Sequence, residues 1–332
     1  MRTTPSVRVA CAGVATSLVL IACDSQSPSS QGPVSPRVRG AQETFSEPAP
    51  SPEPSPQPSF VPSPDPSPPE TGIDYLPDAP LADGPEKLAI QLTTVHRDLH
   101  RGISAWLQKG GELAGEDVRA IALKALFQQR IYRKLTQNER LARATLQRLP
   151  VDLQRTATDN FTAGNGLFSG LSPLKPPVRF KTTRPASPHL LRDLHRRAGR
   201  RFGIPWEILA AVNFVETRFG RILGPSSAGA LGPMQFLSST WARYGNGGDI
   251  LDPHDSIFGA ARYLAASGGR SDIRTALYHY NNSDDYVNGV RLYAGSIKRD
   301  PNTFYAYYYW QVFVRTTKGD KQLTGPGSNY AR

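Results

Sequence analysis

The stretch "AAVNFVETRFGR" (210–221) carries one carboxylate, Glu216, at the end of an otherwise apolar run, and no second acid lies close to it in the sequence. On a helix, Leu209, Val212 and Asn213 lie behind Glu216 at offsets of seven, four and three, so its carboxyl borders an apolar stripe. Partial burial and the negative end of the helix dipole both raise a carboxyl pKa. A glutamic acid that stays protonated near neutral pH is suited to general acid catalysis.

A second interpretation of Glu216 is structural. A glutamate near a helix C-terminus is more often a solvated or arginine-paired surface residue, and Arg218 and Arg221 follow closely. The downstream sequence favours the catalytic interpretation, because two further motifs with polar and aromatic side chains follow it. They are "SSAGALGPMQFLSSTW" (226–241) and "YHYNNS" (278–283).

Together with "VETRFG" (215–220), these motifs resemble the lysozyme-like lytic transglycosylases that cleave bacterial peptidoglycan, most nearly the exported actinobacterial forms. The first looks like the catalytic E-S motif of that family, the second like its G-x-x-G-x-M-Q signature and the third like its A-Y-N motif. The general similarity reaches from about residue 188 to 314, and more loosely back to Ile90. It implies a mainly α, lysozyme-like catalytic domain of the goose-type or soluble lytic transglycosylase type.

The resemblance also implies a role for individual residues. Glu216 takes the place of the family's acid/base, and Tyr280 that of a tyrosine close enough to the glutamate to hold it in place. The substrate-binding positions implied in this way are Ser226, Met234, Gln235, Tyr280 and Asn281. Three of them have a structural alternative: Met234 fills core, Gln235 caps a helix or lies at the surface, and Tyr280 packs. The aromatic tail "FYAYYYWQVFV" (304–314) either adds a stacking floor for sugars or, as we favour, packs inside the protein.

The chain departs from the family pattern at three positions. Thr217 stands where serine is usual and retains the hydroxyl. Ser238 replaces a proline before "STW", and the bulkier His279 precedes the motif tyrosine, where it would narrow the cleft.

The mechanism implied by the resemblance needs only one carboxylate. Most glycosidases use two, but the aspartates nearest to the motifs are expected in turns or at helix starts, where backbone N–H groups account for them. They are Asp249, Asp252, Asp255 and Asp272. In the family, the same glutamate acts first as acid and then as base, and the product ends in 1,6-anhydro-N-acetylmuramic acid. Two alternatives stay open: a hydrolase of the goose-type lysozyme kind, and a glycan-binding wall protein with weak or no catalysis.

Helical periodicity dominates the sequence after residue 74. Apolar residues recur at spacings of three and four in 85–108 and 115–135, and "TQNE" (136–139) has the form of a capping box. We expect a further helix from 152 to about 162 and a proline-broken loop at 164–180. Helices then follow from Pro188, with the one that carries Glu216 ending near Gly220, and irregular pieces such as 221–231 complete the site.

The N-terminal region predicts export and anchoring. Residues 1–22 have basic residues followed by a short apolar run, as in a signal peptide, and "LIAC" (20–23) resembles a bacterial lipobox. Cys23 would then be acylated and hold the protein on the outer face of the cytoplasmic membrane, in the cell envelope; the alternative is an ordinary signal with a chance cysteine. Proline fills 11 of the 25 positions in 46–70, which predicts an extended tether over 23–73.

The remaining chain divides into a helical segment, 74–170, and a catalytic domain, 171–332. The sequence leaves open whether the segment is a separate scaffold or part of the same globule. We assign it no chemistry, because it shows no lectin-like or repeat pattern.

Composition limits the partners. The formal net charge is +11, which suits anionic envelope polymers; the expected partners are peptidoglycan glycan strands and the membrane. RNP, KH and zinc-finger patterns are absent, so we expect no nucleic acid partner. After the signal and Cys23 there is no cysteine, and "DPHD" (252–255) reads as a helix cap. We therefore expect no metal, no cofactor and a monomer.

Overall fold

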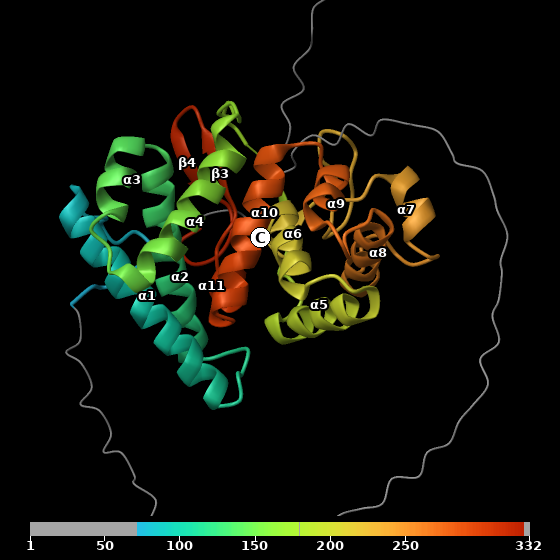
Figure 1. The fold of residues 1–332 in the computed structure, drawn as a ribbon. Coiled ribbons are helices and arrows are strands. Elements are labelled where there is room, and N and C mark those ends of the chain that lie inside the picture. The colour runs from blue at the N-terminus through green and yellow to red at the C-terminus, as the bar shows by residue number, and fades with distance from the viewer. Residues whose placement is uncertain (1–71, 179, 329–332) are drawn as a thin grey trace, which may run out of the picture. The chain divides into compact units, whose positions relative to one another are not determined.

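Helices make up most of the part of the chain that the structure, a computed structural model, describes: residues 72–178 and 180–328 (Figure 1). The expectation of a mainly α fold is confirmed. The helices are α1 (Pro85–Gln108), α2 (Glu116–Thr136), α3 (Glu139–Leu146), α4 (Val151–Ser169), α5 (Pro188–Phe202), α6 (Trp206–Thr217), α7 (Ser238–Tyr244), α8 (Pro253–Ala266), α9 (Ile273–Tyr280), α10 (Asp284–Arg299) and α11 (Asn302–Tyr308). The described residues also form two antiparallel pairs of short strands: β1 (Lys181–Thr182) with β2 (Ile222–Leu223), and β3 (Phe313–Thr316) with β4 (Gly319–Gln322).

The N-terminal helices follow the predicted periodicity. The stripe on α1 is fully buried; it consists of Leu88, Leu92, Val95, Leu99 and Ile103. This stripe packs against α2, which presents its own buried face of Ile121, Ala125 and Ile131. The amphipathic pattern therefore placed both helices correctly.

The predicted capping box at 136–139 is wrong. Thr136 is the last residue of α2, and its hydroxyl donates to the Arg133 carbonyl. The cap of α3 is Asn138 instead, whose side chain accepts a hydrogen bond of 3.0 Å from the Leu141 N–H. An asparagine directly before the helix can perform the same capping function as the more distant threonine.

The helix predicted to end near residue 162 continues to Ser169, so the start of the expected loop at 164–180 is wrong. Gly164 and Gly166, which suggested a loop, lie instead where α4 meets its neighbours closely: a Cβ on Gly164 would lie 3.4 Å from Thr136 of α2. A Cβ on Gly166 would lie 3.4 Å from the Asp285 carboxylate, and a Cβ on Gly289 of α10 would lie 2.8 Å from Leu167. Here glycine reduces the distance between two packed helices, and this contact outweighs its low helix propensity.

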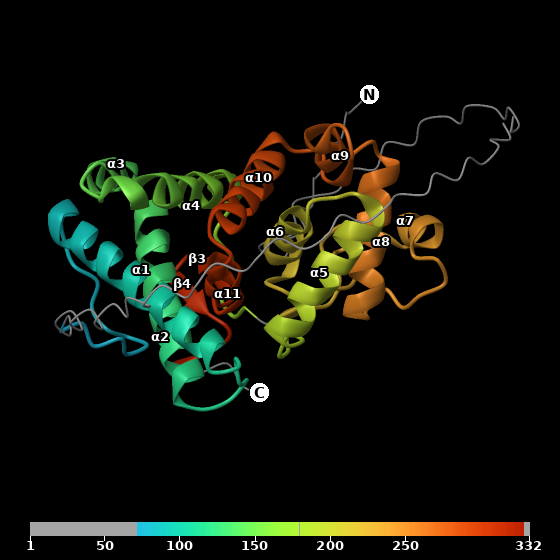
Figure 2. The same cartoon turned by 60° about the horizontal axis from the view of Figure 1, so that its bottom comes forward.

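One core joins the N-terminal helices to the rest of the described chain. α10 contacts α4 on one side and α6 on the other, as both views show (Figures 1 and 2). The described residues from Ile73 onward form a single compact unit with a common hydrophobic core. The helices of 74–170 are therefore part of the same globule, although the boundary placed at residue 170 stays a prediction.

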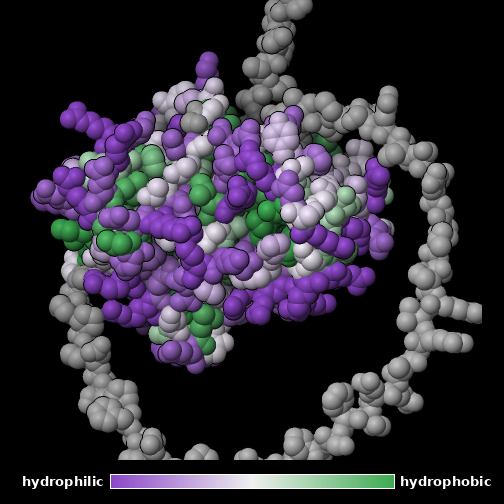
Figure 3. Space-filling model, viewed as in Figure 1, coloured by the Kyte–Doolittle hydropathy of each residue, from purple (hydrophilic) through white to green (hydrophobic). Residues whose placement is uncertain are grey.

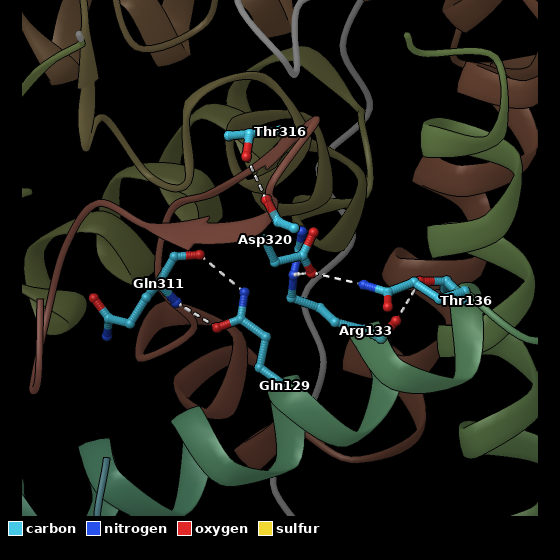
Figure 4. Close-up of polar contacts among 8 residues, drawn as sticks. Gln129, Arg133, Thr136, Gln311, Thr316 and Asp320 are labelled. Atoms are coloured by element: carbon cyan, nitrogen blue, oxygen red, sulfur yellow. Dashed lines mark hydrogen bonds and ion pairs between the residues drawn. The ribbon is translucent and has the colours of Figure 1, made fainter. Parts of the chain in front are cut away.

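The C-terminal chain is fixed to α2 by polar contacts (Figure 4). The Gln129 amide donates to the Gln311 carbonyl at 2.9 Å and accepts from the Gln311 N–H at 2.7 Å, and both residues are buried. Arg133, one turn further along α2, donates to the Asp320 carboxylate of β4 at 2.7 Å. Both backbone groups of Gln311 are paired by one side chain. Gln129 thus supplies the two hydrogen bonds that a helix or strand would otherwise provide for Gln311.

The surface of this unit is mainly hydrophilic on the face shown in Figure 3, with apolar residues scattered between charged ones. None of the helices in 72–178 and 180–328 combines the length and the apolar composition that crossing a bilayer requires. The predicted signal peptide, Cys23 and all but the end of the tether lie outside the described residues and stay predictions.

Gln129→Leu should lower the free energy of unfolding by about 3 kcal/mol, because it leaves a buried N–H and a buried carbonyl of Gln311 without partners. Chemical denaturation measures this loss. The matched control is Gln137→Leu at the C-cap directly after the same helix; its bond to Asp320 is exposed and should contribute less than about 1 kcal/mol. Equal effects of the two substitutions would contradict the role given to Gln129.

Candidate active site

Glu216 lies in the last turn of α6, and its residue is only 4% exposed. The Tyr286 hydroxyl of α10 donates a hydrogen bond of 2.7 Å to its Oε1. Tyr286 is itself fully buried, in the core between α6 and α9. The carboxyl group is therefore largely enclosed by protein, and the bond from Tyr286 orients it.

Burial raises the pKa of Glu216 to about 8, and the hydrogen bond from Tyr286 acts in the opposite direction. The charged carboxylate loses more hydration energy on burial than one neutral hydroxyl returns. Glu216 is consequently protonated at neutral pH. This agrees with the pKa shift predicted from the position of Glu216 beside an apolar stripe.

Among the described residues, Arg218 and Arg221 bond to other groups than Glu216, so the arginine-paired alternative for Glu216 is wrong. The Arg218 guanidinium donates to the Phe214 carbonyl at 2.7 Å and lies over the Phe214 ring, 4.1 Å from its centroid. The Arg221 guanidinium donates to the Arg218 carbonyl at 3.1 Å and lies over Tyr308. Both arginines are buried, and their cations are satisfied by carbonyl oxygens and aromatic faces.

The helix carrying Glu216 ends at Thr217, three residues before the predicted end at Gly220. Arg218, Phe219 and Gly220 follow with φ of 53°, 62° and 85°. The Phe219 N–H returns to the Asn213 carbonyl and the Arg218 N–H to the Phe214 carbonyl, which closes the helix end. Two non-glycine residues in the left-handed region carry a backbone cost, and the burial of Phe219 and of the Arg218 head stabilises them there.

The signature loop "LGPMQF" (231–236) is tied to the glutamate helix through its carbonyl groups. The Pro233 carbonyl accepts from the Thr217 hydroxyl at 2.7 Å and from the Asn213 amide at 3.0 Å. Thr217 Oγ1 in turn accepts from the Gly220 N–H at 2.8 Å. The hydroxyl retained at Thr217 thus connects the end of α6 to the loop.

The loop itself is a tight turn closed by backbone bonds between Leu231 and Phe236, both 2.8 Å. Gly232 has φ of 77°, and a Cβ there would lie 1.9 Å from the Ile250 carbonyl oxygen. Only glycine fits this position. The family signature therefore has a steric basis in this chain.

Tyr280 does not hold Glu216 as the resemblance implied. Its hydroxyl donates to the Met234 carbonyl at 2.5 Å, which fixes the signature loop to α9. The hydroxyl that reaches the glutamate belongs to Tyr286, six residues later, whose ring is stacked parallel to that of Tyr280 at 6.4 Å. Sequence reasoning missed Tyr286; the signal was a tyrosine in the first turn of the helix capped by Ser283, directly after the third motif.

The other predicted substrate-binding residues gather on the same loops, but all are buried. Met234 is 0% exposed and lies in the hydrophobic core, which agrees with its structural alternative. Ser226 Oγ accepts from the N–H groups of Ala228 and Ala230 and so shapes its own loop. Gln235 and Asn281 are buried at 3% and 1% exposure. Their roles toward a substrate stay predictions.

Two departures from the family pattern have little effect on the fold. α7 begins at Ser238 although the usual proline is absent. His279 is on the exposed side of α9, where its carbonyl accepts from the Tyr263 hydroxyl. The aromatic tail packs inside the protein, as favoured: Tyr305 and Trp310 are 1% and 4% exposed.

The aspartates of this region have structural partners. Asp252 and Asp272 cap α8 and α9, Asp255 accepts from the Asp249 N–H, and Asp249 accepts from the Leu251 N–H. Asp252, His254 and Asp255 do bring three possible ligand atoms within 4.8 Å of one another. Their capping bonds explain the cluster, and the absence of a bound metal stays a prediction.

Comparison with known proteins agrees with this geometry. Residues 193–301 match the Transglycosylase SLT domain, whose lysozyme-like all-helical fold is consistent with the described helices. The expected resemblance is thereby confirmed over α6 to α10 and both later motifs.

Among curated proteins, the chain is similar to membrane-bound lytic murein transglycosylase F of Thiobacillus denitrificans, with 32% identity over 122 residues. The match covers 34% of this chain and 26% of the relative, so the chain spans about a quarter of that relative's length. No solved structure matches the chain.

The raised pKa of Glu216 predicts a pH-dependent stability. The folded state keeps the proton up to about pH 8 and the unfolded chain loses it near pH 4.5, so the unfolding free energy should fall as pH rises between these values. The unfolding free energy of Glu216→Gln minus that of the parent should therefore increase by about 3 kcal/mol between pH 4 and pH 7. Urea denaturation across this range measures it, with Glu207→Gln at the other end of α6 as control. The same pH dependence in both variants would refute the assignment.

Thr217→Val should lower the unfolding free energy by about 2 kcal/mol, because the partly buried Gly220 N–H loses its acceptor and Pro233 loses one donor. Thr217→Ser keeps the hydroxyl and should cost about 1 kcal/mol for the lost methyl group. Calorimetry or denaturant titration distinguishes the two. A valine variant as stable as the serine variant would exclude the hydroxyl as the link between α6 and the loop.

Proposed function

We propose that this protein is a peptidoglycan lytic transglycosylase in which Glu216 is the single acid and base. The observation that carries the proposal is the buried, protonated Glu216 carboxyl that Tyr286 orients. The domain match at 193–301 and the similarity to a lytic murein transglycosylase support the reaction class.

In the proposed first step, Glu216 gives its proton to the oxygen that joins N-acetylmuramic acid to N-acetylglucosamine. The carbonyl of the muramic N-acetyl group stabilises the positive charge that develops at the anomeric carbon. A pKa near 8 suits this step, since the acid is then protonated at neutral pH without holding its proton too tightly.

In the second step, the ionised Glu216 takes the proton of the muramic C6 hydroxyl, and that oxygen bonds to the anomeric carbon. The product has a 1,6-anhydro end, and no water is consumed. The Tyr286 hydrogen bond stabilises the carboxylate during the interval between the two proton transfers. The aspartates of α8 and α9 are engaged in caps, which supports a mechanism that uses no second carboxylate.

The proposal extends to substrate contacts and location. Ser226, Gln235, Tyr280 and Asn281 would border the glycan, and the peptidoglycan strand is the partner. We further propose that the protein acts as a monomer in the cell envelope and is held to the membrane through Cys23.

Mass spectrometry of muropeptides released from purified peptidoglycan tests the reaction. The parent should release products one water lighter than the hydrolysed forms, at a rate that falls as pH rises through about 8. Glu216→Gln should lower the rate by roughly a thousandfold, while Glu207→Gln should retain it.

Each other outcome has a defined meaning. Products with reducing ends would identify a hydrolase. Binding of glycan without release would identify a wall-binding protein, and an unchanged rate in Glu216→Gln would remove Glu216 from the mechanism.

A further inference from the structure

A hollow of about 280 Å³ lies between α5, α8 and the loop that follows α7. Arg197 and Arg201 line it from α5, one helical turn apart, and Arg262 lines it from α8. His254 at the start of α8 also lines the hollow. Three arginines around one concavity favour the binding of an oxyanion.

The guanidinium groups are partly pre-organised. Phe202, the last residue of α5, has the Arg201 head 5.7 Å and the Arg262 head 5.4 Å from its ring centroid. Arg262 also donates to the Tyr244 carbonyl. Holding a flexible cation in place before binding lowers the entropy cost of contacting a ligand.

Negative charge within the lining is limited to Asp255. Its Oδ2 accepts from the Asp249 N–H at 2.9 Å, and its Oδ1 lies 2.9 Å from His254 Nδ1. Arg197 lies 3.3 Å from Asp193, but both side chains are about half exposed, and such a pair is weak. The hollow therefore keeps an excess of positive charge.

The hollow is separate from the glutamate site. It lies beside the end of α5, which leads directly into the start of α6, whereas Glu216 lies ten residues further along α6. That is a rise of roughly 15 Å. A continuous hydrophilic surface over α5 is visible at the lower edge of the molecule in Figure 3, in the view of Figure 1.

We propose that this α5–α8 hollow binds the carboxylate of a short acidic peptide of the kind that branches from the glycan. This inference rests on the proposed function for the identity of the polymer. The hollow is larger than one oxyanion needs, and Phe258 and the backbone of Gly245 and Gly248 add an apolar and a peptide-like wall. These features favour a peptide end over a bare phosphate. Binding there would hold a branched strand while Glu216 acts on the same polymer.

The test compares two double variants of α5 in a Glu216→Gln background, so that cleavage does not interfere. Arg197→Gln with Arg201→Gln changes the hollow; Arg196→Gln with Arg200→Gln removes the same charge from exposed positions of the same helix outside the lining. Sedimentation with phosphate-free peptidoglycan should show roughly tenfold weaker binding for the first variant only. On glycan stripped of its peptides by an amidase, the two variants should bind equally.

Several results would overturn the inference. If both double variants lost the same binding affinity, the effect would be one of general charge. If the two variants differed on stripped glycan as much as on intact peptidoglycan, the hollow would contact sugar rather than peptide. A difference that requires phosphate-bearing wall polymers would assign the hollow to phosphate.

A measurement on the parent protein avoids any folding defect of the variants. Calorimetry with the peptides that the amidase releases should show binding, and blocking their carboxylates as amides should abolish it. Because these assays measure binding, they remain informative even if muropeptide analysis shows no transglycosylase activity.

Discussion

The hydrogen bond between Tyr286 and Glu216 constrains the rest of the structure, because a buried carboxyl needs a partner that the protein must bring from another helix. The bond requires α10 to lie against the end of α6. The core around both residues also keeps Glu216 buried, and this burial raises its pKa. The acid is therefore a property of the packed helices rather than of the glutamate alone.

α10 receives support from the N-terminal helices. α4 packs on α10, and the glycines Gly166 and Gly289 allow the two helices to approach closely. α2 in turn holds the chain that follows α11 through Gln129. The segment for which the sequence suggests no chemistry thus covers the side of α10 away from α6 and stabilises the position of Tyr286.

The signature loop illustrates why certain residues recur in its motif. The Pro233 carbonyl is bound by Thr217 and Asn213, and the Met234 carbonyl by Tyr280. Glycine is needed at position 232 because a Cβ there would collide with the Ile250 carbonyl oxygen. Motif side chains that look like substrate contacts in the sequence therefore also hold a loop beside Glu216, and their burial follows from that structural role.

The sequence by itself determined the helices with strong apolar stripes and the position of Glu216 at the end of one helix. It also determined the two motifs downstream of Glu216. These features depend on local periodicity and on residue type. Only the tertiary structure decided that Tyr286 rather than Tyr280 bonds to Glu216. It also decided that α4 continues past Gly164 and Gly166 to Ser169, and that α6 ends at Thr217. The physical reason is the same in each case. These features depend on contacts between segments far apart in the chain, where close packing and buried hydrogen bonds outweigh local propensity.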